Sequence, residues 1–302
     1  MTTTLPFTIL MPVYAGETAD NLRQALESLR LQTLPPTEIL LVQDGDLPAA
    51  LSEVITAYKR SLPLKLLRVA PAAKRHFGLG HALRSGVECS AHEIILRFDT
   101  DDICLTNRCE VQVGEMAADP SLILYSSNII EFSSTTHHLT ASRNVPLTDE
   151  SIRAWLPRRN PLNHMTVGYR KSAVLAAGNY EDMPLFEDYW LWLRMAKVPG
   201  RIKNSAAPFV FARAGQNLAL RRHGMKTAAA EFHFQKVLLR RGFIHRGHFF
   251  ANLFSRVLSR LMPLTLYEIL YGKILRARPV RLPEDADGRL ANEMRLWGLK
   301  WR

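Results

Sequence analysis

The chain has 302 residues, of which 47% are hydrophobic, so it can bury a full core and fits one large domain or one domain with an appendage. Its 39 lysines and arginines exceed its 28 aspartates and glutamates, and the net charge of +11 predicts attraction to phosphate groups on nucleotides, nucleic acid or anionic lipids. The three cysteines lack paired metal-ligand spacing, which argues against a disulfide framework and a zinc site.

The N-terminal stretch MTTTLPFTIL has neither a positively charged segment nor a long apolar core. No window of the chain approaches the roughly 18 uninterrupted apolar residues that a spanning helix needs. We therefore expect neither a signal peptide nor a membrane-spanning helix, and a protein that stays in the cytoplasm.

Strand-like and helix-like segments alternate through the first half of the chain. Apolar runs of strand length cover Phe7–Tyr14, Glu38–Gly45 and Glu93–Asp99, and apolar residues recur at helical spacing in Ala49–Arg60 and Gly80–Ser90. This alternation predicts a mainly parallel sheet with helices on both faces. Ligands of such sheets bind at the carboxyl ends of the strands, where Tyr14, Asp44 and Asp99 stand.

The pattern is less regular after Pro120, where Ser121–Phe132 is strand-like and His164–Gly178 reads as a strand followed by a helix that ends at a glycine. Residues Leu185–Lys197 predict a buried helix rich in aromatic side chains. We divide the chain into a domain at residues 1–225 and a helical, basic region at residues 226–302.

The C-terminal region contains an amphipathic basic segment, Asn252–Met262, in which Arg256 and Arg260 lie off the apolar face. A second apolar and basic stretch covers residues 266–278. Two interpretations stay open. These segments pack on the protein's own domain, or they lie on a membrane surface with Trp297 and Trp301 at the level of the lipid headgroups.

The stretch RFDTDDI places Asp99, Asp101 and Asp102 directly behind an apolar strand. A solvated turn would not need a rigid strand to support it. Divalent Mg²⁺ or Mn²⁺ prefers oxygen ligands and commonly uses one or two carboxylates together with substrate phosphates. The pattern therefore indicates a divalent cation among these carboxylates.

The sequence resembles the family 2 glycosyltransferases in six segments and in their order along the chain. These segments are MPVY, QDGD, GLGHALRSG, FDTDD, NHMTV and FEDYWLW. The resemblance runs from about residue 7 to about residue 224. It implies a GT-A (nucleotide-diphospho-sugar transferase) fold, with a mostly parallel central sheet flanked by helices and, in this chain, a helical basic C-terminal extension. It also implies an inverting enzyme that uses a nucleotide sugar.

The resemblance implies that Pro12, Val13 and Tyr14 line the pocket for the base and that Asp44 accepts a hydrogen bond from a base N–H group. Relatives commonly have two acidic residues where this chain reads QDGD, so Gln43 leaves base selectivity open.

The FDTDD segment would supply the metal ligands, with Asp101 facing Mn²⁺ or Mg²⁺ and Asp99 reaching the ribose or a metal-bound water. Asp102 extends this cluster. Asp188 would be the catalytic base, with Glu187 beside it. The alternative is that Glu187 and Asp188 merely cap a helix, because the helix dipole favours a carboxylate in the first turn.

Further contacts to the diphosphate or the acceptor are expected from basic residues in loops. His164 follows a loop and faces either the acceptor or a structural partner. The candidates for the diphosphate are Arg75, Arg221 and Arg222.

Within the family, the sequence is similar to bacterial transferases that build O-antigen, capsule or exopolysaccharide repeat units. This implies a UDP-sugar donor, with glucose or galactose as the transferred sugar, and a sugar acceptor on undecaprenyl diphosphate. It also implies peripheral contact with the anionic cytoplasmic face of the bacterial inner membrane. The alternatives are another acceptor or a basic nucleic-acid-binding protein. Against the latter, the aromatic residues lie in apolar runs and not in basic patches, so no nucleic-acid partner is expected.

Overall fold

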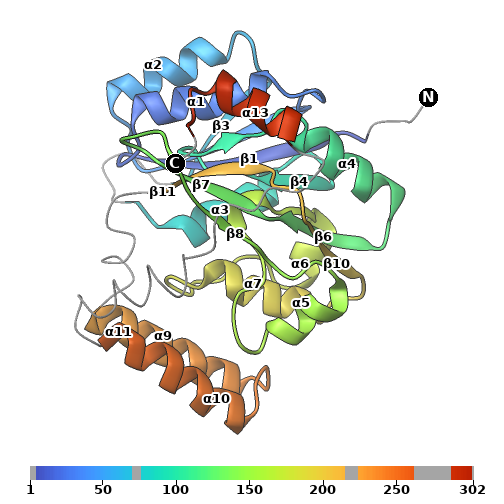
Figure 1. The fold of residues 1–302 in the computed structure, drawn as a ribbon, viewed down its shortest axis with the longest axis vertical. Coiled ribbons are helices and arrows are strands. Elements are labelled where there is room, and N and C mark those ends of the chain that lie inside the picture. The colour runs from blue at the N-terminus through green and yellow to red at the C-terminus, as the bar shows by residue number, and fades with distance from the viewer. Residues whose placement is uncertain (1–4, 70–75, 215–223, 262–286, 301–302) are drawn as a thin grey trace.

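The computed structural model describes residues 5–69, 76–214, 224–261 and 287–300. Its main sheet has seven strands in the order β10-β6-β9-β4-β1-β2-β3 (Figure 1). These strands are β1 (Phe7–Tyr14), β2 (Glu38–Asp44), β3 (Leu64–Arg68), β4 (Ile94–Arg97), β6 (Leu122–Ser127), β9 (Gly168–Arg170) and β10 (Arg201–Ser205).

Neighbouring strands of this sheet run parallel, except that β9 is antiparallel to both β4 and β6. The sequence-based prediction of a mainly parallel sheet is thereby confirmed. It did not include the antiparallel strand, which inserts into the middle of the sheet.

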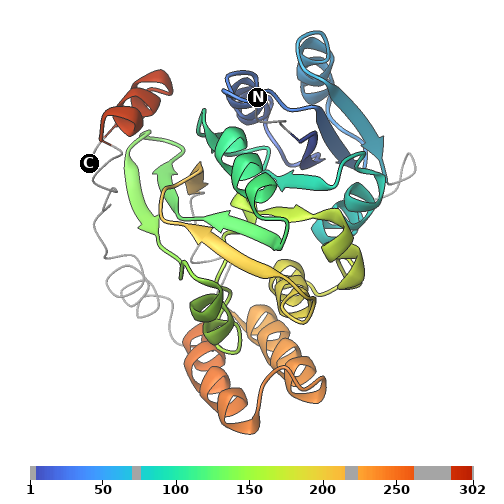
Figure 2. The same cartoon turned by 90° about the vertical axis from the view of Figure 1, so that its right-hand side faces the viewer.

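Helices cover both faces of the sheet, as the alternation of segments predicted (Figures 1 and 2). Phe7, Ile9 and Met11 of β1 point into a core that α1, α2 and α4 share, whereas Leu10 points into the core of α3, α5, α6 and α7. Both faces are buried, which explains why the strands are continuous apolar runs. The helices are α1 (Ala19–Arg30), α2 (Ala49–Tyr58), α3 (Leu79–Cys89), α4 (Arg108–Ala118), α5 (Asp149–Trp155), α6 (Lys171–Ala176) and α7 (Glu187–Met195).

A second sheet of four strands, in the order β5-β11-β7-β8, lies beside the main one. Helix α13 (Asp287–Leu296) packs against it, and Leu290, Met294 and Leu299 join the strand residues in a third core. The last part of the described chain therefore returns to the body of the molecule. The strands are β5 (Ile103–Cys104), β7 (Ile129–Ser133), β8 (Leu139–Arg143) and β11 (Val210–Ala214).

In the described range 224–261, which follows β11, the chain forms α9 (Met225–Arg240), α10 (Arg246–Asn252), the π-helical turn η2 (Leu253–Val257) and α11 (Leu258–Leu261). Helix α9 contributes Phe234 and Leu238 to the core behind α7. Within the described ranges, every helix is too short or too polar to cross a bilayer. The predicted apolar stretch at residues 266–278 lies outside the described residues.

Candidate active site

The polar residues at the strand ends meet at one edge of the main sheet. Tyr14 of β1 pairs in register with Asp44 of β2, and Leu10 of β1 pairs with Arg97, the last residue of β4. Asp99 follows Arg97 after a single residue, so it lies at the same edge. The strand-end rule thus placed these side chains correctly relative to one another.

The residues predicted to contact the base of the nucleotide differ in exposure. Val13 is buried, Pro12 is half-buried, and Tyr14 is 51% exposed with its ring centroid 6.1 Å from that of His76. Asp44 is buried, and its Oδ1 and Oδ2 atoms accept hydrogen bonds from the backbone N–H groups of Phe77 and Gly78 at 2.7 and 2.8 Å. Asp44 therefore holds the backbone in front of α3, a structural role that the sequence analysis did not anticipate.

The three aspartates of the RFDTDDI stretch form a compact acidic cluster. One carboxylate oxygen of each of Asp99, Asp101 and Asp102 lies within 4.8 Å of the other two. Burial and the charge of Asp99 raise the pKa of Asp101 to about 7, and burial and the charge of Asp101 raise the pKa of Asp102 well above its usual value. The Oδ2 atom of Asp102 is buried without a hydrogen-bond partner. Crowded, partly unsatisfied carboxylate oxygens are the ligand set that a hard divalent cation requires, so these residues fit Mg²⁺ or Mn²⁺.

Two side chains outside the RFDTDDI stretch border this acidic cluster. Glu17 accepts a hydrogen bond from Thr100 at 2.9 Å, and its charge adds to the forces that raise the pKa of Asp101. Arg213, near the end of β11, donates from its backbone N–H to Asp102 Oδ1 and from Nε to the carbonyl oxygen of Asp101, both at 2.7 Å. The sequence analysis missed both residues because nothing in their local pattern marks them.

Arg97 interacts electrostatically with both the acidic cluster and the predicted catalytic base. It is fully buried and forms an ion pair with Asp99. Burial acts to lower the pKa of Arg97, but the charge and hydrogen bond of Asp99 outweigh it and raise this pKa. Burial raises the pKa of both Asp101 and Asp188, and the positive charge of Arg97 acts against this in each case, so one buried guanidinium is electrostatically coupled to both groups. The sequence analysis did not select Arg97, although a charged residue at the end of an apolar strand could have indicated that it interacts with the nearby carboxylates.

The predicted base Asp188 lies in the first turn of α7, as the sequence indicated. Its Oδ2 atom accepts a hydrogen bond from Asn160 Nδ2 at 2.8 Å, and its Oδ1 atom accepts one from the N–H of Tyr189 at 2.6 Å. Burial raises the pKa of Asp188, although both hydrogen bonds act to lower it. Burial and the charge of Asp188 raise the pKa of the adjacent Glu187 to about 7. Asn160 comes from a loop that the sequence analysis did not select.

Helix α3 approaches α7 closely beside these carboxylates. A Cβ atom on Gly80 would lie 3.4 Å from the Cβ atom of Glu187, which is an ordinary van der Waals distance. The two helices are therefore close here, and a small side chain would also fit at this position.

His164 has a structural partner in this structure. Its Nε2 atom lies 2.9 Å from the hydroxyl oxygen of Tyr180, and its ring meets the Trp192 ring edge to face at 5.8 Å. Burial and the charge of Arg97 lower the pKa of His164 well below its usual value, which keeps the imidazole neutral. Of the remaining predicted contacts, Arg75, Arg221 and Arg222 lie outside the described residues.

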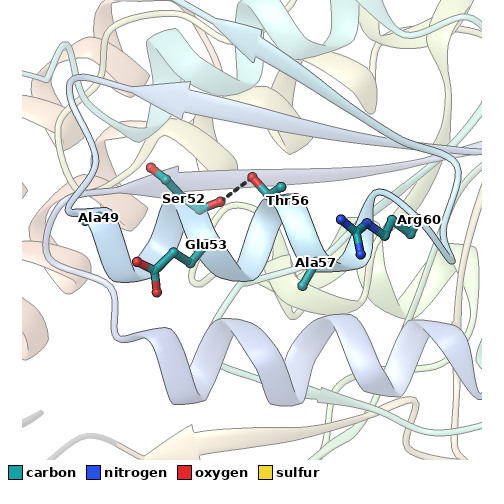
Figure 3. A pocket seen from close by; sticks show the side chains of 6 residues that line it. All are labelled: Ala49, Ser52, Glu53, Thr56, Ala57 and Arg60. Carbon is teal, nitrogen blue, oxygen red and sulfur yellow. Dashed lines mark hydrogen bonds between the residues drawn. The ribbon is translucent and has the colours of Figure 1, made fainter.

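A separate hollow of about 490 Å³ lies on the surface of α2 (Figure 3). Its lining includes Ser52, Glu53 and Arg60, whose side chains point in different directions along the helix. The hydroxyl of Thr56 is engaged with the carbonyl oxygen of Ser52 at 2.8 Å. This hollow presents no convergent polar groups and contains none of the candidate site residues, so it does not compete with the strand-end site.

The chain is similar to known glycosyltransferases. The family model described as "Glycosyl transferase family 2" matches residues 8–176. The chain is 35% identical to the amylovoran biosynthesis glycosyltransferase AmsE of Erwinia amylovora, covering 88% of this chain and 98% of that protein. It is 30% identical to the UDP-Gal:alpha-D-GlcNAc-diphosphoundecaprenol beta-1,3-galactosyltransferase of Escherichia coli, covering 89% and 96%.

A solved structure supports the fold. The structure of S. aureus TarS 1–349 in complex with UDP-GlcNAc matches with a TM-score of 0.60 at 15% identity, covering 96% of this chain and 80% of that one. This similarity concerns the fold, which is the GT-A fold that the sequence predicted. The family match extends over more than half of the chain, and the chain therefore belongs to glycosyl transferase family 2.

Proposed function

We propose that the protein is an inverting glycosyltransferase that moves glucose or galactose from a UDP-sugar to a saccharide on a lipid diphosphate. It would act in bacterial surface polysaccharide biosynthesis, at the cytoplasmic face of the inner membrane. The observation that carries the proposal is the presence of two carboxylate groups with different environments, the acidic cluster after β4 and Asp188 at the start of α7, both coupled to the buried Arg97.

The relatives support the substrates that we propose. The E. coli enzyme is named for a UDP-Gal donor and a GlcNAc-diphosphoundecaprenol acceptor, and the Erwinia enzyme for amylovoran biosynthesis. We propose that this chain also uses a UDP-sugar donor and a lipid-diphosphate acceptor, and that Tyr14 and Asp44 contact the base of the nucleotide.

Each group has a defined task in the proposal. Asp101 and Asp99 would hold Mn²⁺ or Mg²⁺, which supplies Lewis-acid neutralisation of the charge that develops on the departing diphosphate. Asp188 accepts the proton of the acceptor hydroxyl as that oxygen attacks the sugar carbon. Attack from the side opposite the leaving group inverts the anomeric centre, so an α-configured donor gives a β linkage.

The proposal is tested by incubating the full-length protein with Mn²⁺, a panel of UDP-sugars and a synthetic GlcNAc-diphosphate lipid. We expect one UDP-hexose to give a glycosylated lipid with a β linkage, detected by mass spectrometry and by the anomeric proton signal in NMR. An α-linked product would contradict inversion. The absence of product with every donor in the panel would contradict the proposed substrates.

The rate of transfer should depend on pH through the carboxylates at the start of α7. Burial raises the pKa of Asp188 above its usual value and that of the neighbouring Glu187 to about 7, so both carboxylates take up a proton at a higher pH than exposed ones would. We expect kcat/KM, measured at saturating Mn²⁺, to fall as the pH is lowered on the acid side of neutrality. Substitution Glu187→Gln removes a neighbouring negative charge and should move this acid limb to lower pH. An unchanged profile in the Glu187→Gln variant would assign the limb to a different group.

A further inference from the structure

The last described helices before the chain returns to the second sheet form a helical hairpin, which we define as residues 225–261. Helix α9 is one arm, and α10, η2 and α11 together form the other (Figures 1 and 2). The two arms lie side by side at the end of the molecule, and the N–H of Gly224 donates to the carbonyl oxygen of Arg260 at 3.0 Å where they meet.

The interior of the helical hairpin contains a layer of polar side chains. Glu231 of α9 is fully buried, and its carboxylate accepts hydrogen bonds from Arg256 Nη1 at 3.2 Å and from Arg260 Nη2 at 2.6 Å. Asn252 donates to Gln235 Oε1 at 3.0 Å. Asn252, Arg256 and Arg260 recur every fourth residue, so the polar face of the second arm is turned toward α9.

The apolar face of the same arm is consequently turned toward solvent. Phe250 is 66% exposed, Phe254 is 75% exposed and Leu261 is 45% exposed, with the half-buried Val257 between them. A surface helix of a water-soluble domain normally has the opposite arrangement. We call these four residues the apolar stripe. An exposed apolar stripe with a polar layer behind it indicates a surface that meets another apolar phase.

The charged residues of the helical hairpin indicate which apolar phase the apolar stripe meets. The sequence of the helical hairpin contains seven lysines and arginines and a single carboxylate, Glu231, which is buried. Lys226, Arg240, Arg241 and Arg246 are exposed, so the charged groups that this part of the structure presents to solvent are positive. Arg246 lies one turn before Phe250 on the same helix, α10. Exposed aromatic and aliphatic side chains on a segment whose exposed charges are positive match the interface of an anionic lipid bilayer, whose phosphates attract the cations.

We propose that the apolar stripe is the surface with which the protein lies on an anionic bilayer, with Phe250 and Phe254 inserted at the level of the headgroups. This inference rests in part on the proposed function, because a lipid-diphosphate acceptor is held in such a bilayer. It assigns the membrane contact to particular residues of the helical hairpin.

The helical hairpin is connected to both elements that support Asp188. The ring of Phe234 on α9 stacks on the ring of Phe186, directly before α7, with centroids 4.5 Å apart. The Nδ2 atom of Asn252 donates to the carbonyl oxygen of Pro157 at 3.0 Å, and Arg256 Nη2 donates to that of Arg158 at 2.6 Å, in the segment that leads to Asn160. Binding of the helical hairpin to a bilayer would therefore hold the segments that carry Asp188 and Asn160 close to that bilayer.

Flotation of the purified protein with vesicles tests this proposal without acceptor, donor or metal. We expect wild type to float with vesicles rich in phosphatidylglycerol and to bind more weakly at high salt. The double variant Phe250→Ser/Phe254→Ser should bind at least about tenfold more weakly, because two aromatic rings no longer leave water. Leu175→Ser is the matched control, since Leu175 is 43% exposed on α6, and it should float like wild type.

Equal flotation of the double variant and wild type would overturn the proposal. A wild-type dimer in sedimentation that the double variant converts to monomers would also overturn it, because a second copy would then cover the apolar stripe. We expect the double variant to retain the wild-type melting temperature and the wild-type rate on a water-soluble, short-chain acceptor. Vesicle binding without transfer to any acceptor would instead contradict the proposed function and leave this inference standing.

Discussion

Substitution Asp188→Asn is expected to lower the rate of sugar transfer by about 10²- to 10⁴-fold while leaving the affinity for the UDP-sugar close to that of wild type. An amide cannot accept the proton of the attacking hydroxyl. It can still accept the hydrogen bond from the N–H of Tyr189, which wild type forms at 2.6 Å. The new amide N–H₂ group would oppose Asn160 Nδ2, and the loss of that one hydrogen bond costs about 1 kcal/mol, so the fold should persist.

The measurement is single-turnover transfer at saturating donor, together with the dissociation constant of the UDP-sugar with Mn²⁺. Asp182→Asn is the matched control, because Asp182 is exposed in the segment before α7 and its loss removes a charge without removing the base. If the Asp188→Asn variant kept the wild-type rate, the assignment of the base would be wrong. An equal loss of donor affinity would place Asp188 in donor binding instead.

Substitution Asp101→Asn should remove the stabilising effect of the metal ion. Without metal at pH 8, the variant should be more stable than wild type by ~1 kcal/mol, or roughly 2–4 °C in Tm, because the repulsion among Asp99, Asp101 and Glu17 is reduced. With Mn²⁺, wild type should gain stability that the variant lacks, since a ligand that binds only the native state raises its stability. Transfer should fall by about 10²-fold or more.

Thermal unfolding with and without Mn²⁺, followed by the transfer assay, measures these effects. Asp20→Asn is a suitable control, because Asp20 is an exposed aspartate that pairs with Arg23 on the surface of α1. Its substitution should change neither the metal response nor the rate. An Asp101→Asn variant that Mn²⁺ stabilises as much as wild type would show that the cation binds elsewhere.

The main sheet could be predicted because its strands are buried on both faces and therefore appear as continuous apolar runs, as in FTILMPVY of β1. Strand β9 could not, because it has three residues and takes its place between β4 and β6 through contacts distant in sequence. The acidic cluster was predictable because a single segment supplies all three of its carboxylates.

The residues that complete the site were not predictable, because they come from distant segments without a distinctive pattern. Asn160 lies in an irregular loop, and Glu17 and Arg213 reach the acidic cluster from segments far before and far after it in the sequence. The amphipathic pattern of residues 252–262 indicated a helix but not which face packs inward. That choice depends on Glu231, a buried carboxylate on another helix, which must be paired with Arg256 and Arg260 to avoid an uncompensated charge.

The antiparallel direction of β9 divides the site into two parts that can vary independently. In a purely parallel sheet, the segments that follow strands supply the carboxyl edge, and here these carry Tyr14, Asp44 and the acidic cluster. Because β9 runs the other way, the segment that precedes it also reaches this edge, and it brings Asn160 and His164. Exchange of residues 157–167 between family members would thus alter the surroundings of Asp188 while leaving Tyr14, Asp44 and the acidic cluster unchanged, so the two parts of the site can be varied separately by evolution and by enzyme engineering.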